Sequence, residues 1–124
     1  MSKKVFLDAF FNQFGDFLDE LTKVFPDDTD IPAYKVGLGL LQRTNPILVI
    51  KTTYEHMQGF EKVIRARNED FFLKHEFAEY DTLEQVIAKI KSLWVGLSEN
   101  NKNCVWGYLT ILLDISKRYN ALSS

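Results

Sequence analysis

The sequence predicts an all-α fold: a helical bundle of four long helices plus one short helical element, with the last two helices forming an antiparallel hairpin. Apolar residues recur every three or four positions through most of the 124 residues, as on the buried face of a helix. Residues that commonly begin helices, such as N-capping side chains followed by proline, occur at several points between these stretches. The strict alternation typical of strands is missing. No linker interrupts the chain, so residues 1–124 are expected to form a single domain.

The first helix is predicted over residues 5–25. Its apolar positions, among them Phe10, Phe14, Phe17 and Leu21, follow the three-and-four spacing of one stripe. The helix should stop before Pro26, because the residue that precedes a proline is disfavoured in helical geometry. The acidic residues 26–30 then form a loop.

Three further elements are predicted in the middle of the chain. Asp30, followed by Ile31 and Pro32, starts a helix that runs to about residue 43 and is weakened by two glycines. Asn45 followed by Pro46 is a stronger start signal, and it predicts a helix from 45 to about 67. Asn68 can cap the start of residues 68–77, which are expected to form a brief helix or an aromatic loop that folds back on the core.

The last two helices are predicted from a capping-box pattern and a polar connection. Asp81-Thr-Leu-Glu84 opens a helix of about 82–97, residues 98–102 form a tight link, and apolar residues from 105 to 119 mark the final helix. Ser98 is the expected cap of that helix. Gly96 and Gly107 are expected to lie close together across the hairpin.

Charge is nearly balanced but unevenly distributed. Seventeen acidic and fifteen basic side chains give a net charge of −2, so no global positive field attracts nucleic acid or anionic lipid. Residues 1–33, 34–67, 68–85 and 86–124 carry net charges of −4, +4, −5 and +3. Packed neighbours of opposite sign should therefore pair within the molecule.

Several features predict an intracellular protein that is not secreted and has no membrane partner. Cys104 is the single cysteine, and no Asn-x-Ser/Thr site occurs. Acidic residues stand where a signal peptide would need its apolar stretch. No uncharged stretch approaches the roughly 20 residues of a membrane-spanning helix.

Recognisable sites for catalysis, metals or cofactors are missing from the sequence, so we expect no enzyme, no metal and no cofactor. His56 and His75 are expected at the surface, and only Glu79 follows either one at helical spacing, which is too few ligands for zinc. Cys104 is expected to be an inert, partly buried thiol. No phosphate-binding glycine motif occurs, and the acidic loops lack the pattern of a calcium site.

Two surfaces remain as candidates for binding. Lys51, Lys62, Arg65 and Arg67 form a possible nucleic-acid patch on the third helix, with aromatic residues between them. The chain also holds ten Phe, five Tyr and two Trp. This is a large number of aromatic rings for the core of a small helical domain to bury. We expect either a dense aromatic core or an exposed aromatic surface for self-association, with four candidate interface or hairpin anchors: Phe71, Phe72, Trp94 and Trp106.

Three stretches together resemble small, largely uncharacterised proteins encoded by large double-stranded DNA viruses of algae and protists. They are Asn45-Pro46, residues 68–73, and residues 89–109 with Trp94 and Trp106. The resemblance covers about residues 5–120 and is most specific over 94–108. It implies a viral origin and a host-cytoplasm or virion setting, but no activity.

The expected function is therefore a non-enzymatic viral interaction or assembly module. Its partner is a protein, either a second copy in a homodimer or another viral or host protein. A nucleic-acid-binding role through the basic patch is the alternative.

Overall fold

The computed structural model describes residues 2–78 and 81–123, and within this part of the chain the regular structure is entirely helical. The helices are α1 (Lys3–Val24), α2 (Asp30–Thr44), α3 (Pro46–Met57), α4 (Glu61–Ala66), α5 (Glu69–Lys74), α6 (Thr82–Leu93) and α7 (Glu99–Ser123), with 3₁₀ turns η1 (Gln58–Phe60) and η2 (Trp94–Gly96). The all-α prediction is confirmed. Among the described residues five helices have twelve residues or more, one more than the four long helices of the predicted bundle. The helix predicted from Asp30 to about residue 43 is present as α2.

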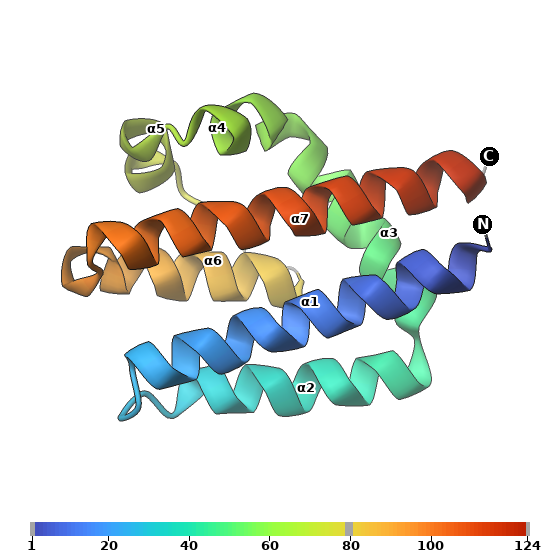
Figure 1. Cartoon of the computed structure of the whole chain (residues 1–124), viewed down its shortest axis with the longest axis horizontal. Coiled ribbons are helices and arrows are strands. Elements are labelled where there is room, and N and C mark those ends of the chain that lie inside the picture. Colours follow the sequence, from blue (N-terminus) through green and yellow to red (C-terminus); the bar gives the residue numbers. More distant parts are fainter. Residues whose placement is uncertain (1, 79–80, 124) are drawn as a thin grey trace.

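α1, α2, α6 and α7 lie along the longest axis of the molecule (Figure 1). α1 packs between α2 and α7, and α3 crosses these helices and contacts α7. The segment with α4 and α5 covers one end of α7 (Figure 1). This arrangement leaves one long side of α2 without a covering helix.

The core is built mainly from the apolar stripes of α1, α6 and α7. Phe10, Phe14 and Leu18 of α1 are fully buried, as is Leu112 of α7. On α6, Ile87 is almost fully buried. A dense aromatic core is therefore present, and it fits the spacing that predicted the first helix.

Side-chain caps begin three helices at the predicted places. The Asp81 carboxylate accepts a hydrogen bond from the Glu84 N–H at 2.8 Å, and the Asn68 side chain accepts one from Phe71 N–H at 3.1 Å. Ser98 Oγ accepts a bond from the Asn101 N–H at 3.1 Å. Since Ser98 caps α7, residues 99–102 form its first turn, and the prediction of a link over 98–102 is wrong there.

The single helix predicted from 45 to about 67 is broken in the structure. α3 ends at Met57, and the η1 turn around Gly59 redirects the chain before α4 begins at Glu61. Glycine weakens a helix, and the turn brings the Phe60 ring to within 5.3 Å of the Phe77 ring, centre to centre. The aromatic contact and the glycine together explain the break.

The antiparallel hairpin of α6 and α7 is present (Figure 1), but its predicted glycine contact is wrong. A Cβ atom on Gly107 would have no described neighbour within 4 Å, and one on Gly96 would meet the Phe25 ring instead. The end of the hairpin is held by two tryptophans: Trp94 of η2 and Trp106 of α7 pack edge to face, with ring centres 5.7 Å apart. Rings of this size keep the backbones apart, so the glycines do not meet.

Candidate functional site

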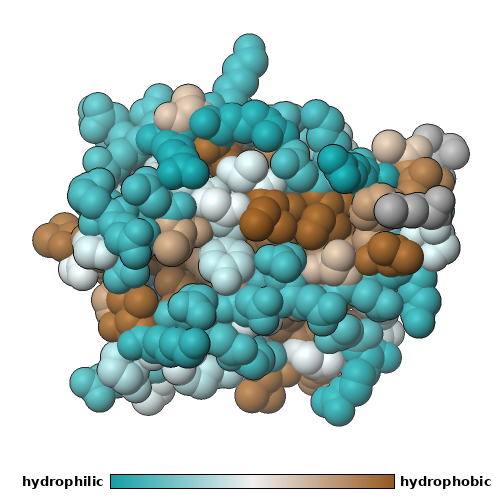
Figure 2. All heavy atoms as spheres, in the orientation of Figure 1, coloured by the Kyte–Doolittle hydropathy of each residue, from teal (hydrophilic) through white to brown (hydrophobic). Residues whose placement is uncertain are grey.

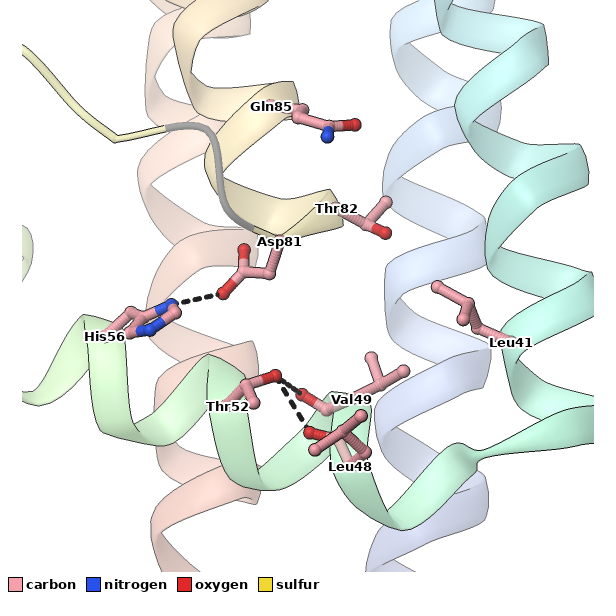
Figure 3. Close-up of a pocket in the computed structure, with 8 residues that line it drawn as sticks. All are labelled: Leu41, Leu48, Val49, Thr52, His56, Asp81, Thr82 and Gln85. Carbon is pink, nitrogen blue, oxygen red and sulfur yellow. Dashed lines mark hydrogen bonds and ion pairs between the residues drawn. The ribbon is translucent and has the colours of Figure 1, made fainter.

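A cavity of about 490 Å³ opens between α2, α3 and α6 (Figure 3). One wall is apolar and is formed by Leu41, Leu48 and Val49. The opposite side is polar and is lined by Thr52, His56, Asp81, Thr82 and Gln85. Such a combination of an apolar wall with a few converging polar groups is typical of ligand-binding pockets.

His56 and two carboxylates meet at the polar side of this cavity. His56 Nδ1 lies 2.7 Å from Asp81 Oδ2 and 2.9 Å from Glu84 Oε1. The side chains of Asp81 and Glu84 are only 13% and 9% exposed. We call these three residues the His56 cluster. It joins the end of α3 to the first turn of α6.

The electrostatics of the His56 cluster favour a charged imidazole when no other cation is present. A hydrogen bond to Asp81 raises the pKa of His56 above its ordinary value, and the charges of Asp81, Glu84 and Glu55 act in the same direction. Burial opposes this shift. At pH values below this raised pKa, the imidazolium compensates the charge of the two nearly buried carboxylates.

Sequence analysis did not predict this cluster. His56 was expected as a surface residue, and the cluster forms because the tertiary fold brings in Asp81 from 25 residues further along the chain. The only sequence signal was the capping-box pattern, which puts Asp81 and Glu84 on the same helical turn. Glu79, the residue that follows His75 at helical spacing, lies outside the described residues.

The expected nucleic-acid patch is partly neutralised. Arg65 forms ion pairs with Glu61 at 2.8 Å and with Asp114, and Arg67 donates a hydrogen bond to Asn103. Lys51 and Lys62 are exposed, and neither forms an ion pair with another described residue. Of the four residues only Arg65 is paired with carboxylates, because the Asn103 side chain that Arg67 contacts is uncharged.

The ion pairs at Glu61 predict a pH dependence of stability. Hydrogen bonds from Arg65, and then from Lys117, lower the pKa of Glu61 below its ordinary value. The contribution of this carboxylate to stability is therefore present above about pH 4.3 and is lost as the pH falls through the lower pKa of the folded state. In Glu61→Gln, urea unfolding should show less loss of stability than wild type between pH 5 and pH 3. Equal losses in both proteins would contradict the assignment.

The four expected aromatic anchors separate into two groups. Phe72, Trp94 and Trp106 are buried and pack against one another, so they hold the hairpin and α5 together. The Trp94 indole also donates a hydrogen bond to Glu69. Phe71 is 40% exposed and is the most exposed aromatic residue in the described part of the chain. These contacts do not form the expected exposed aromatic surface.

The exposed apolar surface is aliphatic instead. Val36 and Leu40 on α2 are 76% and 54% exposed, and Ile47 and Leu48 at the start of α3 are 49% and 53% exposed. We call these four residues the α2–α3 apolar surface. Leu48 also lines the cavity. Figure 2 shows hydrophobic side chains at the lower edge of the molecule, where α2 lies in Figure 1.

Cys104 differs from its prediction, because the thiol is exposed and not partly buried. It lies in the first turns of α7, near Tyr108 and Asn101 at a small surface pocket.

Among the described helices, none combines the length and the apolar composition that crossing a bilayer requires. Comparisons with protein-family models, with curated proteins and with solved structures found no match to this chain. The viral resemblance and the host-cytoplasm or virion setting therefore stay predictions, and the function has to be argued from the surfaces described above.

Proposed function

We propose that this protein is a non-enzymatic assembly module that pairs with a second copy of itself through the α2–α3 apolar surface. The observation that carries the proposal is the exposure of Val36, Leu40, Ile47 and Leu48 on adjoining helices. Exposed apolar side chains that gather on one part of a surface often mark protein interaction sites.

The size of this surface fits one interface of ordinary dimensions. A standard interface buries about 800 Å² on each partner, and somewhat more than half of this area is apolar. The four residues of the α2–α3 apolar surface would form the apolar centre of such an interface. The neighbouring polar side chains of α2 would form the rim.

The spacing of the exposed residues favours a helix as the contacting element. Ala33, Val36, Leu40 and Arg43 follow each other at intervals of three, four and three residues, and all four are exposed. This is the spacing of the contact stripe between two packed helices. The stripe on α2 is therefore suited to a second helix that lies along it.

Charge supports a second copy as that partner. α2 is preceded by an acidic turn with the exposed Asp27 and ends with the exposed Arg43, and neither residue forms an ion pair with another described residue. Two α2 helices in antiparallel orientation, with the symmetry axis between Val36 and Leu40, place Arg43 of each copy opposite Ala33 of the other, on the side of the acidic turn that precedes α2. Such an isologous contact is the commonest form of dimer.

The nucleic-acid alternative has less support, because Arg65, the central cation of the patch, is paired with Glu61 and Asp114 within the molecule. It predicts retention on nucleic acid that falls with salt. If retention is unchanged after charge reversal of Lys62, Arg65 and Arg67, the alternative is wrong.

Disulfide trapping tests the proposed orientation. In a Cys104→Ser background, a Val36→Cys chain is mixed with a Leu40→Cys chain that carries a distinguishable tag. We expect the mixed disulfide to form readily, because residue 36 of one copy faces residue 40 of the other. A chain with Val95→Cys is the matched control, since Val95 is a fully exposed valine on η2. Equally fast trapping through position 95, or none through 36 and 40, would contradict the proposal.

A further inference from the structure

We propose that the His56 cluster binds one divalent metal ion of the zinc class, with an open coordination position that faces the cavity. The site uses one imidazole nitrogen and two carboxylate oxygens from α3 and from the start of α6. These are donor types that zinc takes in proteins. The inference is independent of self-association, because it uses none of the four residues of the α2–α3 apolar surface.

The distances within the cluster suit an ion of this size. The three donor atoms of His56, Asp81 and Glu84 all lie within 4.8 Å of one another. Zinc bonds of about 2.0–2.2 Å in tetrahedral geometry separate ligand atoms by roughly 3.3–3.5 Å. The present separations of 2.7 and 2.9 Å at His56 Nδ1 have to widen by only about half an ångström for an ion to replace the proton between these atoms.

The fold also orients the ligands. One oxygen of Asp81 accepts the hydrogen bond from the Glu84 N–H, which leaves the other oxygen directed at His56 (Figure 3). Groups that fix a ligand in this way strengthen metal binding. Glu84 is 7% exposed as a residue, and a carboxylate buried to this extent needs a compensating positive charge. A divalent ion supplies more of that charge than an imidazolium does.

The cavity provides the open side of the site. His56 and Asp81 line it together with Thr52, Thr82 and Gln85. These polar groups can hydrogen-bond to water molecules that complete the coordination. Three protein ligands with an accessible fourth position are the arrangement of an open zinc site, in contrast to a closed structural one.

Zinc retention by the purified protein tests this inference. The protein is prepared in a Cys104→Ser background, because an exposed thiol can bind zinc by itself. It is stripped with a chelator, loaded with zinc chloride, dialysed, and then analysed for metal content and by calorimetric titration. We expect one zinc ion per chain, and dissociation constants that are about tenfold or more higher in His56→Gln and Asp81→Asn.

Two controls separate binding from folding and from general histidine affinity. Asparagine caps helices as well as aspartate does, so Asp81→Asn should keep α6 intact, which far-ultraviolet circular dichroism checks. His75→Gln should bind zinc as the background protein does, because His75 packs among Phe60, Phe71 and Phe77 away from the cluster. A Val36→Ser, Leu40→Ser variant should also retain zinc, which distinguishes this inference from the proposed dimer.

Two results would overturn the inference. One is the absence of retained zinc in the background protein. The other is equal retention in the His56→Gln and Asp81→Asn variants. In either case the cluster is only an ion pair that joins α3 to α6.

Discussion

Phe72→Ala is expected to lower the free energy of unfolding by about 3–5 kcal/mol, the range for removal of a buried aromatic ring. Phe72 is 2% exposed, and its ring centre lies 5.0 Å from that of Trp94 and 5.3 Å from that of Trp106. Truncation leaves a cavity where α5 meets the α6–α7 hairpin. Since small domains are stable by only about 5–15 kcal/mol, urea unfolding should show a large shift of the midpoint.

The neighbouring residue provides a matched control for this prediction. Phe71 lies on the same short helix, but its side chain is 40% exposed and it contacts Phe60 and His75 at the edge of the cluster. Phe71→Ala should therefore cost much less, about 1 kcal/mol or below. Similar costs for the two substitutions would mean that Phe72 is not the residue that holds α5 to the core.

The second large effect is expected in self-association. The combined variant Val36→Ser, Leu40→Ser should weaken dimer formation by about tenfold or more, because it removes the apolar centre of the proposed interface. Both side chains are exposed in the single chain, so the stability of the monomer should change little. Sedimentation equilibrium of variant and wild type measures the difference.

Val95→Ser is the matched control for the α2 variant. Val95 is an exposed aliphatic residue like the two residues of α2, but it lies on η2. Its replacement should leave the association constant unchanged. Equal weakening by both variants would show a general effect of surface hydrophobicity and would count against an interface at α2.

Local signals explain why much of the fold could be predicted. The phenylalanine stripe of α1 and the capping residues Asn68 and Asp81 act over one or two helical turns, and the structure confirms each of them. The break at Gly59 could not be predicted in this way, because it depends on the contact of Phe60 with Phe77 across the fold. Propensity alone does not reveal such a tertiary contact.

The candidate sites were harder to predict for the same reason. Arg65 belongs to a cluster of basic residues that could contact phosphates. In the fold, however, Asp114, 49 positions further along the chain, forms an ion pair with it. His56 has no ligand at helical spacing, and its partners come from another helix. The aliphatic surface could not be predicted from the sequence, because the helical spacing of Val36 and Leu40 is the same whether their side chains are buried or exposed.

The central claim is that α2 joins two copies of this chain, and the molar mass in solution tests it most directly. Light scattering coupled to size-exclusion chromatography, over a hundredfold range of concentration and at low and high salt, measures that mass. We predict a rise from the 14.4 kDa of one chain toward twice this value, and we expect the rise to persist at high salt, since the contact is mainly apolar. A mass that stays at 14.4 kDa at every concentration would contradict the claim.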